Sequence, residues 1–247
     1  MSSVSQWRRA YSRRVLVLVG LGSLGGFAGL GTSGLAGATS TNGIASKPGS
    51  QIVQTALKNT AAVRSVSFDL TGTSHGEPIT VEGTAGQRAG AATITLGEGT
   101  INVALVHKTV YFKGDQSFYQ QQGASNAKAA QLAGQWVSAP SSDSQFNEFD
   151  QFLLAKSLFI QAGQGVTGTG IRYTKLGNAT IDGTSTIKVS VDGPKKTNDD
   201  GIVYVSTTGT PYLIRARQTG AQGDAVTLSN FNEPVNVEIP RGVVAVS

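Results

Sequence analysis

Residues 201–240, GIVYVSTTGTPYLIRARQTGAQGDAVTLSNFNEPVNVEIP, carry the clearest indication of the fold. It contains three runs rich in β-branched or aromatic residues, at 202–206, 212–218 and 225–229, and such residues favour β-strands. Glycine and proline stand between the runs, where they favour tight turns. The stretch therefore predicts a β-meander, in which short antiparallel strands follow one another.

A family resemblance lies in the same stretch. The pattern VYVS..G.PYLIR is followed by LSNFNEPVNVEIP, whose last ten residues alternate apolar and polar side chains before stopping at a proline. This ending resembles that of the mycobacterial LppX–LprG lipoprotein family and, more distantly, the lipoprotein carriers of the LolA/LolB type. The likeness extends upstream to about Lys47. It implies a half-barrel that holds the acyl chains of a large lipid or lipoglycan.

Alternation at period two continues through most of the chain. Further strands are expected at 66–71, 79–82, 94–96, 101–105, 110–113, 171–176, 179–181 and 187–191. Each run has one apolar and one polar face, which is typical of an antiparallel sheet that is covered on one side. Asp182-Gly183, between the last two runs, is a hairpin signal.

Three segments predict helices. Residues 48–63 carry an apolar stripe at i, i+4 spacing behind Pro48, and residues 127–132 form a short alanine-rich run. The third helix begins at Asp143 or Ser144, either of which is a good N-cap. It carries a cluster of large apolar residues: Phe146, Phe149, Phe152, Leu153, Leu158 and Phe159. These residues either pack as ordinary core or form the aromatic wall of a ligand cavity.

The order of these elements predicts an α+β fold of the LolA/LolB-like kind. Hairpin-linked strands on both sides of a central helical insertion favour a single strongly curved antiparallel sheet, a half-barrel, with helices covering its concave face. We expect about nine to twelve strands and two or three helices. The sequence has no GxGxxG motif, no P-loop and no alternation of strands with crossover helices.

Residues 1–38 have the features of an export signal. Four arginines, at positions 8, 9, 13 and 14, precede an apolar run, and Ala36-Gly37-Ala38 fits a cleavage site. An uncleaved membrane anchor is the alternative, since the segment is long enough to span a bilayer.

Residues 39–50 are expected to be a flexible linker, and residues 51–247 the lipid-binding domain. Ala38 stands where a bacterial lipobox has its acylated cysteine, and the chain contains no cysteine, so no lipid anchor or disulfide is expected.

The charge balance gives no support for nucleic-acid binding. The whole chain has a net charge of +5 and a sequence pI of about 9.5. Without residues 1–38, which contain four arginines and no acids, 209 residues remain (247 − 38), with 16 basic and 15 acidic side chains and a net charge of +1. Apolar strand patterns recur throughout this remainder, so it is expected to be a folded exported protein.

The residue types needed for catalysis are scarce. His75 and His107 are the only histidines, and no third ligand lies at a spacing that would support a metal site. There is no GxSxG or HExxH motif, and the chain has no thiol nucleophile. We therefore expect a protein that is not an enzyme and that needs no metal or cofactor.

Two functions remain open at this point. The resemblance implies a carrier of lipid or lipoglycan acyl chains in the actinobacterial cell envelope, monomeric, exported or tethered, with an envelope transporter or membrane as its further partner. The alternative is a protein-interaction module with a packed interior. For the carrier, period two and the third helix predict these lipid-binding residues: Phe68, Leu70, Val81, Leu96, Val103, Leu105, Phe149, Phe152, Leu153, Val189 and Val205.

Overall fold

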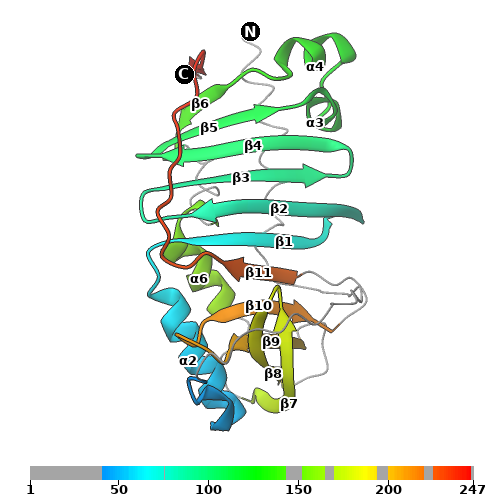
Figure 1. Cartoon of the computed structure of the whole chain (residues 1–247). Coiled ribbons are helices and arrows are strands. Elements are labelled where there is room, and N and C mark those ends of the chain that lie inside the picture. Colours follow the sequence, from blue (N-terminus) through cyan, green and yellow to red (C-terminus); the bar gives the residue numbers. More distant parts are fainter. Residues whose placement is uncertain are drawn as a thin grey trace.

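The computed structural model describes residues 41–74, 76–142, 152–164, 170–193, 200–219 and 225–245. The strands in these ranges are β1 Val66–Ser74, β2 Glu77–Ala85, β3 Ala89–Leu96, β4 Gly99–Val106, β5 Thr109–Gly114, β6 Val137–Pro140, β7 Arg172–Ile181, β8 Thr184–Asp192, β9 Gly201–Ser206, β10 Leu213–Gln218, β11 Ala225–Ser229 and β12 Val244–Ala245. All twelve belong to one open sheet, in the order β12-β6-β5-β4-β3-β2-β1-β11-β10-β9-β8-β7 (Figure 1).

The sheet is antiparallel except at one edge. Only β12 runs parallel to its neighbour, β6, among the strands of the described ranges. The chain order explains the pattern, because β1–β6 form one meander and β7–β11 a second, and β11 then pairs with β1. The predicted single, strongly curved antiparallel sheet is confirmed, and so is its strand number.

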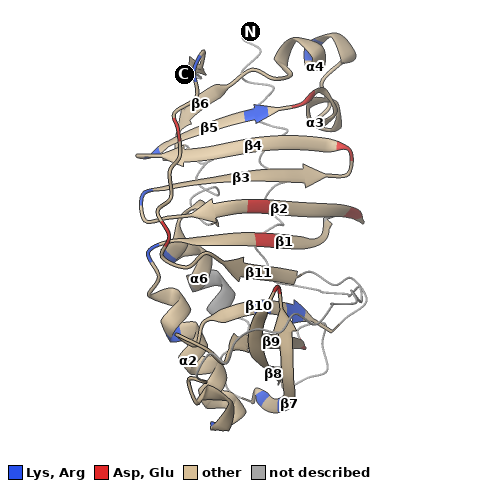
Figure 2. Cartoon of the chain, in the orientation of Figure 1, with Lys and Arg blue, Asp and Glu red and all other residues tan. Residues whose placement is uncertain are grey.

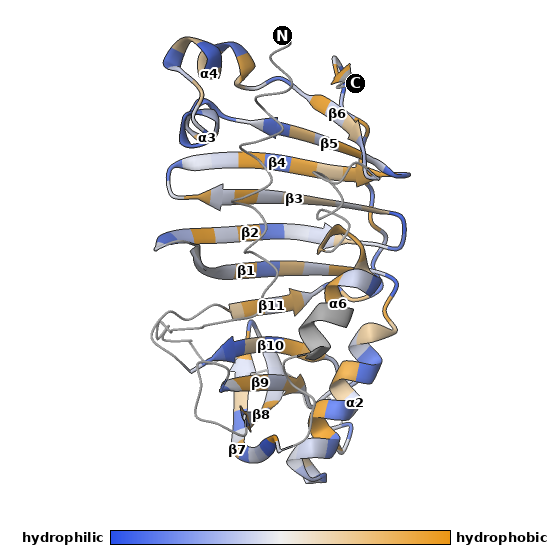
Figure 3. Cartoon of the chain, turned by 180° about the vertical axis from the view of Figure 1, so that it is seen from behind, coloured by the Kyte–Doolittle hydropathy of each residue, from blue (hydrophilic) through white to orange (hydrophobic). Residues whose placement is uncertain are grey.

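The described helical segments are η1 Ile44–Ser46, α2 Gly49–Ala61, α3 Gln116–Gln121, α4 Asn126–Leu132 and α6 Ala155–Gln164. Helix α2 buries Ile52, Val53 and Ala56 and contacts α6 and strands β7–β10. Figure 3 shows α2 and α6 together on one side of the sheet. Helices α2 and α4 confirm two predicted helices. The predicted start of the third, at Asp143 or Ser144, lies outside the described residues.

Helix α3 was not expected from the sequence. Its N-cap is Asp115, whose carboxylate accepts a hydrogen bond from the Phe118 N–H at 2.7 Å. The other carboxylate oxygen accepts from the Thr100 N–H at 2.9 Å, which ties the helix to the start of β4. Phe118 and Tyr119 are thereby buried, and burial raises the pKa of the Tyr119 phenol. The helical segments thus number more than the two or three predicted.

Two β-bulges shape the second meander. The register shifts between Leu213 and Arg215 in β10, and between Lys175 and Gly177 in β7. Gly177 has φ +96°, which only glycine adopts readily. The sequence predicted a break at this glycine, but β7 continues through it as one bulged strand. A bulge increases the local twist, and these two lie in the half of the sheet that turns away from β1–β6 (Figure 1).

The expectation for residues 39–50 is corrected. The expected flexible linker is folded from Thr41 onward: Ile44 is 2% exposed, and the Asn42 amide donates to the Ser206 and Gly209 carbonyls, each at 3.0 Å. The alternating residues 231–240 form no strand. Asn230 and Asn232 have positive φ, which turns the chain away from β11, and the tail crosses the ends of the strands toward β6 (Figure 1).

The export signal or anchor expected at residues 1–38 lies outside the described ranges. No helix within those ranges is both long and apolar enough to cross a membrane.

Candidate functional site

The register of the sheet places the eight predicted strand residues on one face. Directly opposed residues of antiparallel strands point to the same side. Phe68 opposes Leu228 and Gly83, Gly83 opposes Ala92, and Ala92 opposes Val103. The same reasoning connects Leu70 with Val81, Leu96 with Ile79, Leu105 with Gly90, and Val189 with Val203. We call this side, which also carries Val205, the apolar face.

Helical residues meet the apolar face above β1–β3. The Phe152 and Phe68 rings lie edge to face, with centroids 6.5 Å apart. Leu154 forms an isolated bridge with Gly86, and the Ala155 N–H donates to the Gly86 carbonyl at 2.9 Å. A Cβ at Gly90 would overlap the Leu153 carbonyl, so glycine permits this close approach. Residues 152–155 therefore cover the ends of β2 and β3.

The predicted lipid-binding residues are largely packed together. Seven of them are at most 5% exposed: Phe68, Val81, Val103, Leu105, Leu153, Val189 and Val205. Leu70, Leu96 and Phe152 are half-buried, and Phe149 lies outside the described residues. These seven side chains keep little accessible surface, although Phe68 also borders the pocket described next. The structure brings the predicted residues together, but as part of the hydrophobic core.

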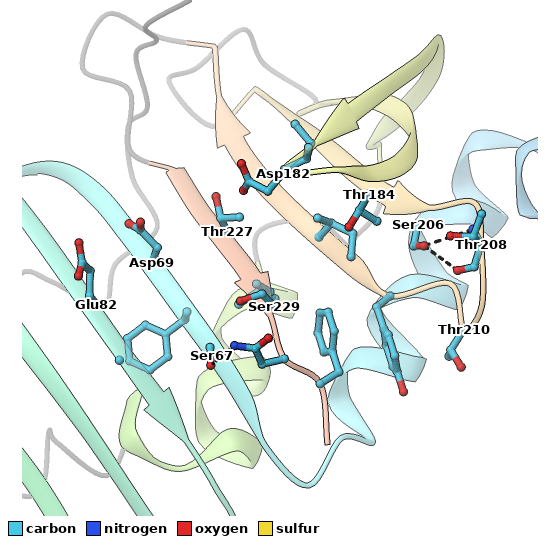
Figure 4. A pocket seen from close by; sticks show the side chains of 18 residues that line it. Ser67, Asp69, Glu82, Asp182, Thr184, Ser206, Thr208, Thr210, Thr227 and Ser229 are labelled. Carbon is cyan, nitrogen blue, oxygen red and sulfur yellow. Dashed lines mark hydrogen bonds between the residues drawn. The ribbon is translucent and has the colours of Figure 1, made fainter. Parts of the chain in front are cut away.

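A pocket lies on the opposite, polar face of the sheet. It has a volume of about 740 Å³, within the range of about 300–1,000 Å³ that is usual for small-molecule sites. We call it the polar groove. Its lining includes hydroxyl and carboxylate side chains: Ser67, Asp69, Glu82, Asp182, Thr184, Ser206, Thr208, Thr210, Thr227 and Ser229 (Figure 4). No sequence pattern predicted this groove.

Strand register explains the floor of the polar groove. Asp69 on β1 opposes Glu82 on β2 and Thr227 on β11, and Ser67 opposes Ser229. These five residues alternate with apolar-face residues along the same strands, so they point to the polar side. Acidic positions of β1 and β2 lie side by side in Figure 2. Like charges directly opposed on neighbouring strands destabilise a sheet, and here neither carboxylate forms an ion pair with a residue of the described ranges.

The wall of the polar groove comes from the far edge of the sheet. Asp182 and Gly183 both have positive φ, 46° and 80°, which suits the two-residue hairpin turn predicted from Asp-Gly. This turn joins β7 to β8, four strands from β1 in the sheet order. Asp182 and Thr184 nevertheless lie across the groove from Asp69 and Thr227 (Figure 4). The bending of the second meander therefore creates the groove.

An aromatic pair completes the lining. Tyr212 and Phe231 stack with centroids 4.3 Å apart and planes at 17°, and both are half-buried. The Tyr212 hydroxyl accepts a hydrogen bond from the Asn232 amide at 3.1 Å, which fixes its ring. No lysine or arginine is among the described residues that line the groove. The lining thus has three carboxylates and no basic side chain to balance them.

The described residues offer no metal centre. No three His, Cys, Asp or Glu side chains of these ranges lie close enough together to hold an ion. The three groove carboxylates are therefore spread along the groove rather than converging on one point. His107 is exposed, in the tight turn between β4 and β5, and His75 lies outside the described residues.

The fold and its two faces define a class: an open, curved antiparallel sheet that carries helices on its apolar face. The fold is similar to that of LprF from Mycobacterium bovis, with a TM-score of 0.52 and 18% identity over 78% of this chain and 96% of LprF. This similarity confirms, at the level of the fold, the predicted resemblance to the mycobacterial lipoproteins. Because identity is below 25%, it establishes the fold and not a ligand.

Two further solved structures have lower TM-scores. Lipoprotein LppX from Mycobacterium tuberculosis has a TM-score of 0.48 and 17% identity over 76% of this chain and 97% of LppX. A LolA superfamily protein from Nitrosomonas europaea has a TM-score of 0.22 and 9% identity over 78% of this chain and 94% of its own. No family model matches the sequence, and no curated protein matches it.

Proposed function

We propose that this protein is a non-enzymatic lipid-binding protein of the cell envelope, which takes up acyl chains at the apolar face between β1–β5 and residues 152–155. The observation that carries the proposal is the continuity of that face. Opposed apolar or glycine positions run without a polar interruption from Val103 on β4 to Leu228 on β11. The LprF-like fold and the expected export signal agree with a role in the envelope.

The energetics favour a protein container for such a ligand. Burying each CH₂ group is worth about 0.8 kcal/mol, so exposing a chain of roughly sixteen carbons costs on the order of 12 kcal/mol. The apolar face supplies side chains of the right chemistry, and the Phe68 ring packs over the small residues Gly83 and Ala92. An acyl chain that displaced this packing would be shielded from water.

Burial of the apolar face implies that uptake requires an opening. Phe68 and Val103 have almost no accessible surface, so a chain cannot reach them while their cover stays in place. Residues 152–155 contact the sheet at Gly86, Gly90 and Phe68, and Leu153 and Ala155 are buried there. Uptake would therefore require this segment to lift from the sheet and to break these contacts. Lifting it would expose Phe68 and Gly90.

The same burial favours a second candidate. A protein-interaction module with a packed interior would also bury these residues, since packed cores leave few voids larger than water. The two candidates differ in whether an acyl chain can enter at all.

A matched pair of neighbouring residues on β1 tests the proposal. Leu70 is half-buried on the apolar face, and Thr71 is exposed on the other face outside the polar groove. We expect the wild type to take up a fluorescent fatty-acid probe, measured by its emission increase. Leu70→Gln should weaken uptake about tenfold, which corresponds to about 1.4 kcal/mol, whereas Thr71→Gln should leave it unchanged.

Circular dichroism and thermal melting would verify that both variants fold. Equal probe affinity in the two variants would place the lipid elsewhere. A folded wild type that takes up no probe, even at high lipid concentration, would favour the interaction module instead.

A further inference from the structure

We propose that the polar groove binds a hydroxyl-rich sugar chain that carries no acidic groups. The groove opens on the polar face, and Phe68, Gly83 and Leu228 of the apolar face also border it. The inference rests on the polar side chains of the groove, so it does not require an acyl chain to be bound. It follows from the chemistry of the lining, from the spacing of the carboxylates and from the way in which the fold builds the groove.

The lining matches the hydrogen-bonding needs of a sugar. Asp69, Glu82 and Asp182 are acceptors only, and sugar hydroxyls would donate to them in charge-assisted hydrogen bonds. Seven serine and threonine side chains also line the groove: Ser67, Thr184, Ser206, Thr208, Thr210, Thr227 and Ser229. The Ser206 hydroxyl already donates to the Thr208 carbonyl and accepts from the Thr208 N–H, and the Ser67 hydroxyl accepts from the Asn230 amide. The other five hydroxyls can donate or accept as the sugar requires. A ligand with hydroxyls on several sides would therefore find partners on the floor and on the wall of the groove.

The aromatic pair adds an apolar contact at one end. Tyr212 and Phe231 are held by stacking and by the hydrogen bond to Asn232. A sugar ring has C–H groups on its faces, and these pack against the electron-rich face or the edge of an aromatic side chain. Rigid aromatic side chains lose little entropy on binding. Hydroxyls and carboxylates along the groove, with an aromatic contact beside them, suit a chain of several sugars.

Other ligand classes fit less well. An anion such as a phosphate or a uronic acid would meet three carboxylates and no basic side chain among the described lining residues. Thr227, which opposes Asp69 on β1, also opposes Arg215 on β10. Arg215 does not line the groove, however. A divalent cation needs carboxylates that converge, and no group in the described ranges does so.

The directly opposed pair Asp69 and Glu82 gives the proposal a distinctive signature. Their mutual repulsion works against folding, so Glu82→Gln should raise the melting temperature. The same change removes a charged acceptor from the groove, so it should weaken sugar binding by at least fivefold. A purely structural role for Glu82 would not produce these opposite effects. Glu98→Gln is the matched control, because Glu98 is exposed in the β3–β4 turn outside the groove.

The test uses the purified protein and four neutral oligosaccharides, built of glucose, mannose, galactose or arabinose, with binding followed by nuclear magnetic resonance. We expect at least one to shift the signals of Tyr212 and Thr227, and a uronic-acid oligomer of similar length to leave them unchanged. Calcium or magnesium chloride alone should also leave them unchanged. Glu82→Gln should weaken the binding, and Glu98→Gln should not.

A second arm identifies the source of the sugar. Vesicles of phosphatidylcholine containing a digalactosyl lipid present the sugar as a headgroup, and the free galactose oligomer presents it as a polysaccharide. Binding to either supports the proposal and assigns the source. The proposal is overturned if none of the four oligosaccharides and no glycolipid vesicle shifts the groove signals. It is also overturned if the uronic acid or the divalent cation shifts them, or if Glu82→Gln binds as tightly as the wild type.

Discussion

The apolar face and the polar groove are built from the same strands, and they differ in how the chain closes over them. On the apolar face, Phe68 and Val103 are almost fully buried and belong to the hydrophobic core. On the polar face, their neighbours Asp69 and Glu82 remain exposed at the edge of a 740 Å³ pocket. Alternation at period two assigns each side chain to a face. Bending of the second meander then decides which face keeps an open space.

Truncation in the apolar face should have the largest effect on stability. Phe112 on β5 has no exposed surface and opposes Val103 and Val137. Phe112→Ala should lower the free energy of unfolding by about 3–5 kcal/mol, because it removes transfer energy and leaves a cavity. Urea denaturation of the variant measures this. Lys113→Ala, which changes the next residue on the polar face, is the control, and it should cost less than about 1 kcal/mol. If both variants lost a similar free energy of unfolding, the apolar face would not contribute more to stability than the polar face.

Loss of the α3 cap should have an intermediate effect. Asp115 accepts hydrogen bonds from the Phe118 and Thr100 N–H groups. Asp115→Ala should lower the free energy of unfolding by about 1–2 kcal/mol, the usual range for an N-cap. Asp115→Asn keeps an acceptor oxygen and should recover more than half of that loss. If Asn and Ala destabilise equally, the carboxylate matters through its charge and not as a cap.

Removal of the opposed carboxylates should have the smallest effect and the opposite sign. Asp69→Asn and Glu82→Gln should each stabilise the fold by about 0.2–1 kcal/mol, because each relieves the same cross-strand repulsion. The double variant should gain little more than either single one, since the interaction is already lost. Denaturation of the four proteins in low salt measures the coupling. Additive gains would show that the carboxylates do not interact, and the gain should shrink in high salt.

Sequence patterning predicted the apolar face well. All eight strand residues expected to share a face do so, because burial of one face enforces the period of two that the sequence displays. The helix α2 was predicted for a similar reason, since its buried residues Ile52, Val53 and Ala56 repeat at helical spacing. Whether these residues bind a lipid remains a prediction.

Sequence patterning missed features that depend on long-range geometry. Asp69 and Asp182 both line the polar groove, although they are far apart in the chain. The bending of β7–β10 brings them to the same groove. The available signal was the acidic and hydroxyl character of the polar positions of β1 and β11, beside the Asp-Gly turn. Helix α3 was missed because Asp115 directly follows a strand, and its capping role appears only with the Thr100 contact.

The mobility of residues 39–50 was overestimated because Ser, Thr, Gly and Asn are common both in mobile segments and in local hydrogen-bonded turns. Asn42 shows the second use: its amide donates to the carbonyls of Ser206, the last residue of β9, and of Gly209, and its side-chain oxygen accepts from the Ile44 N–H. Composition could not distinguish these outcomes, because the partners lie more than 160 residues away.

Native mass spectrometry of the protein purified from its native host, in mild detergent-free buffer, tests lipid binding most directly. We predict a population whose added mass matches one lipid with long acyl chains, and this population should be lost in Leu70→Gln and retained in Thr71→Gln. Only the unliganded mass, from freshly purified and folded wild-type protein, would contradict lipid binding at the apolar face.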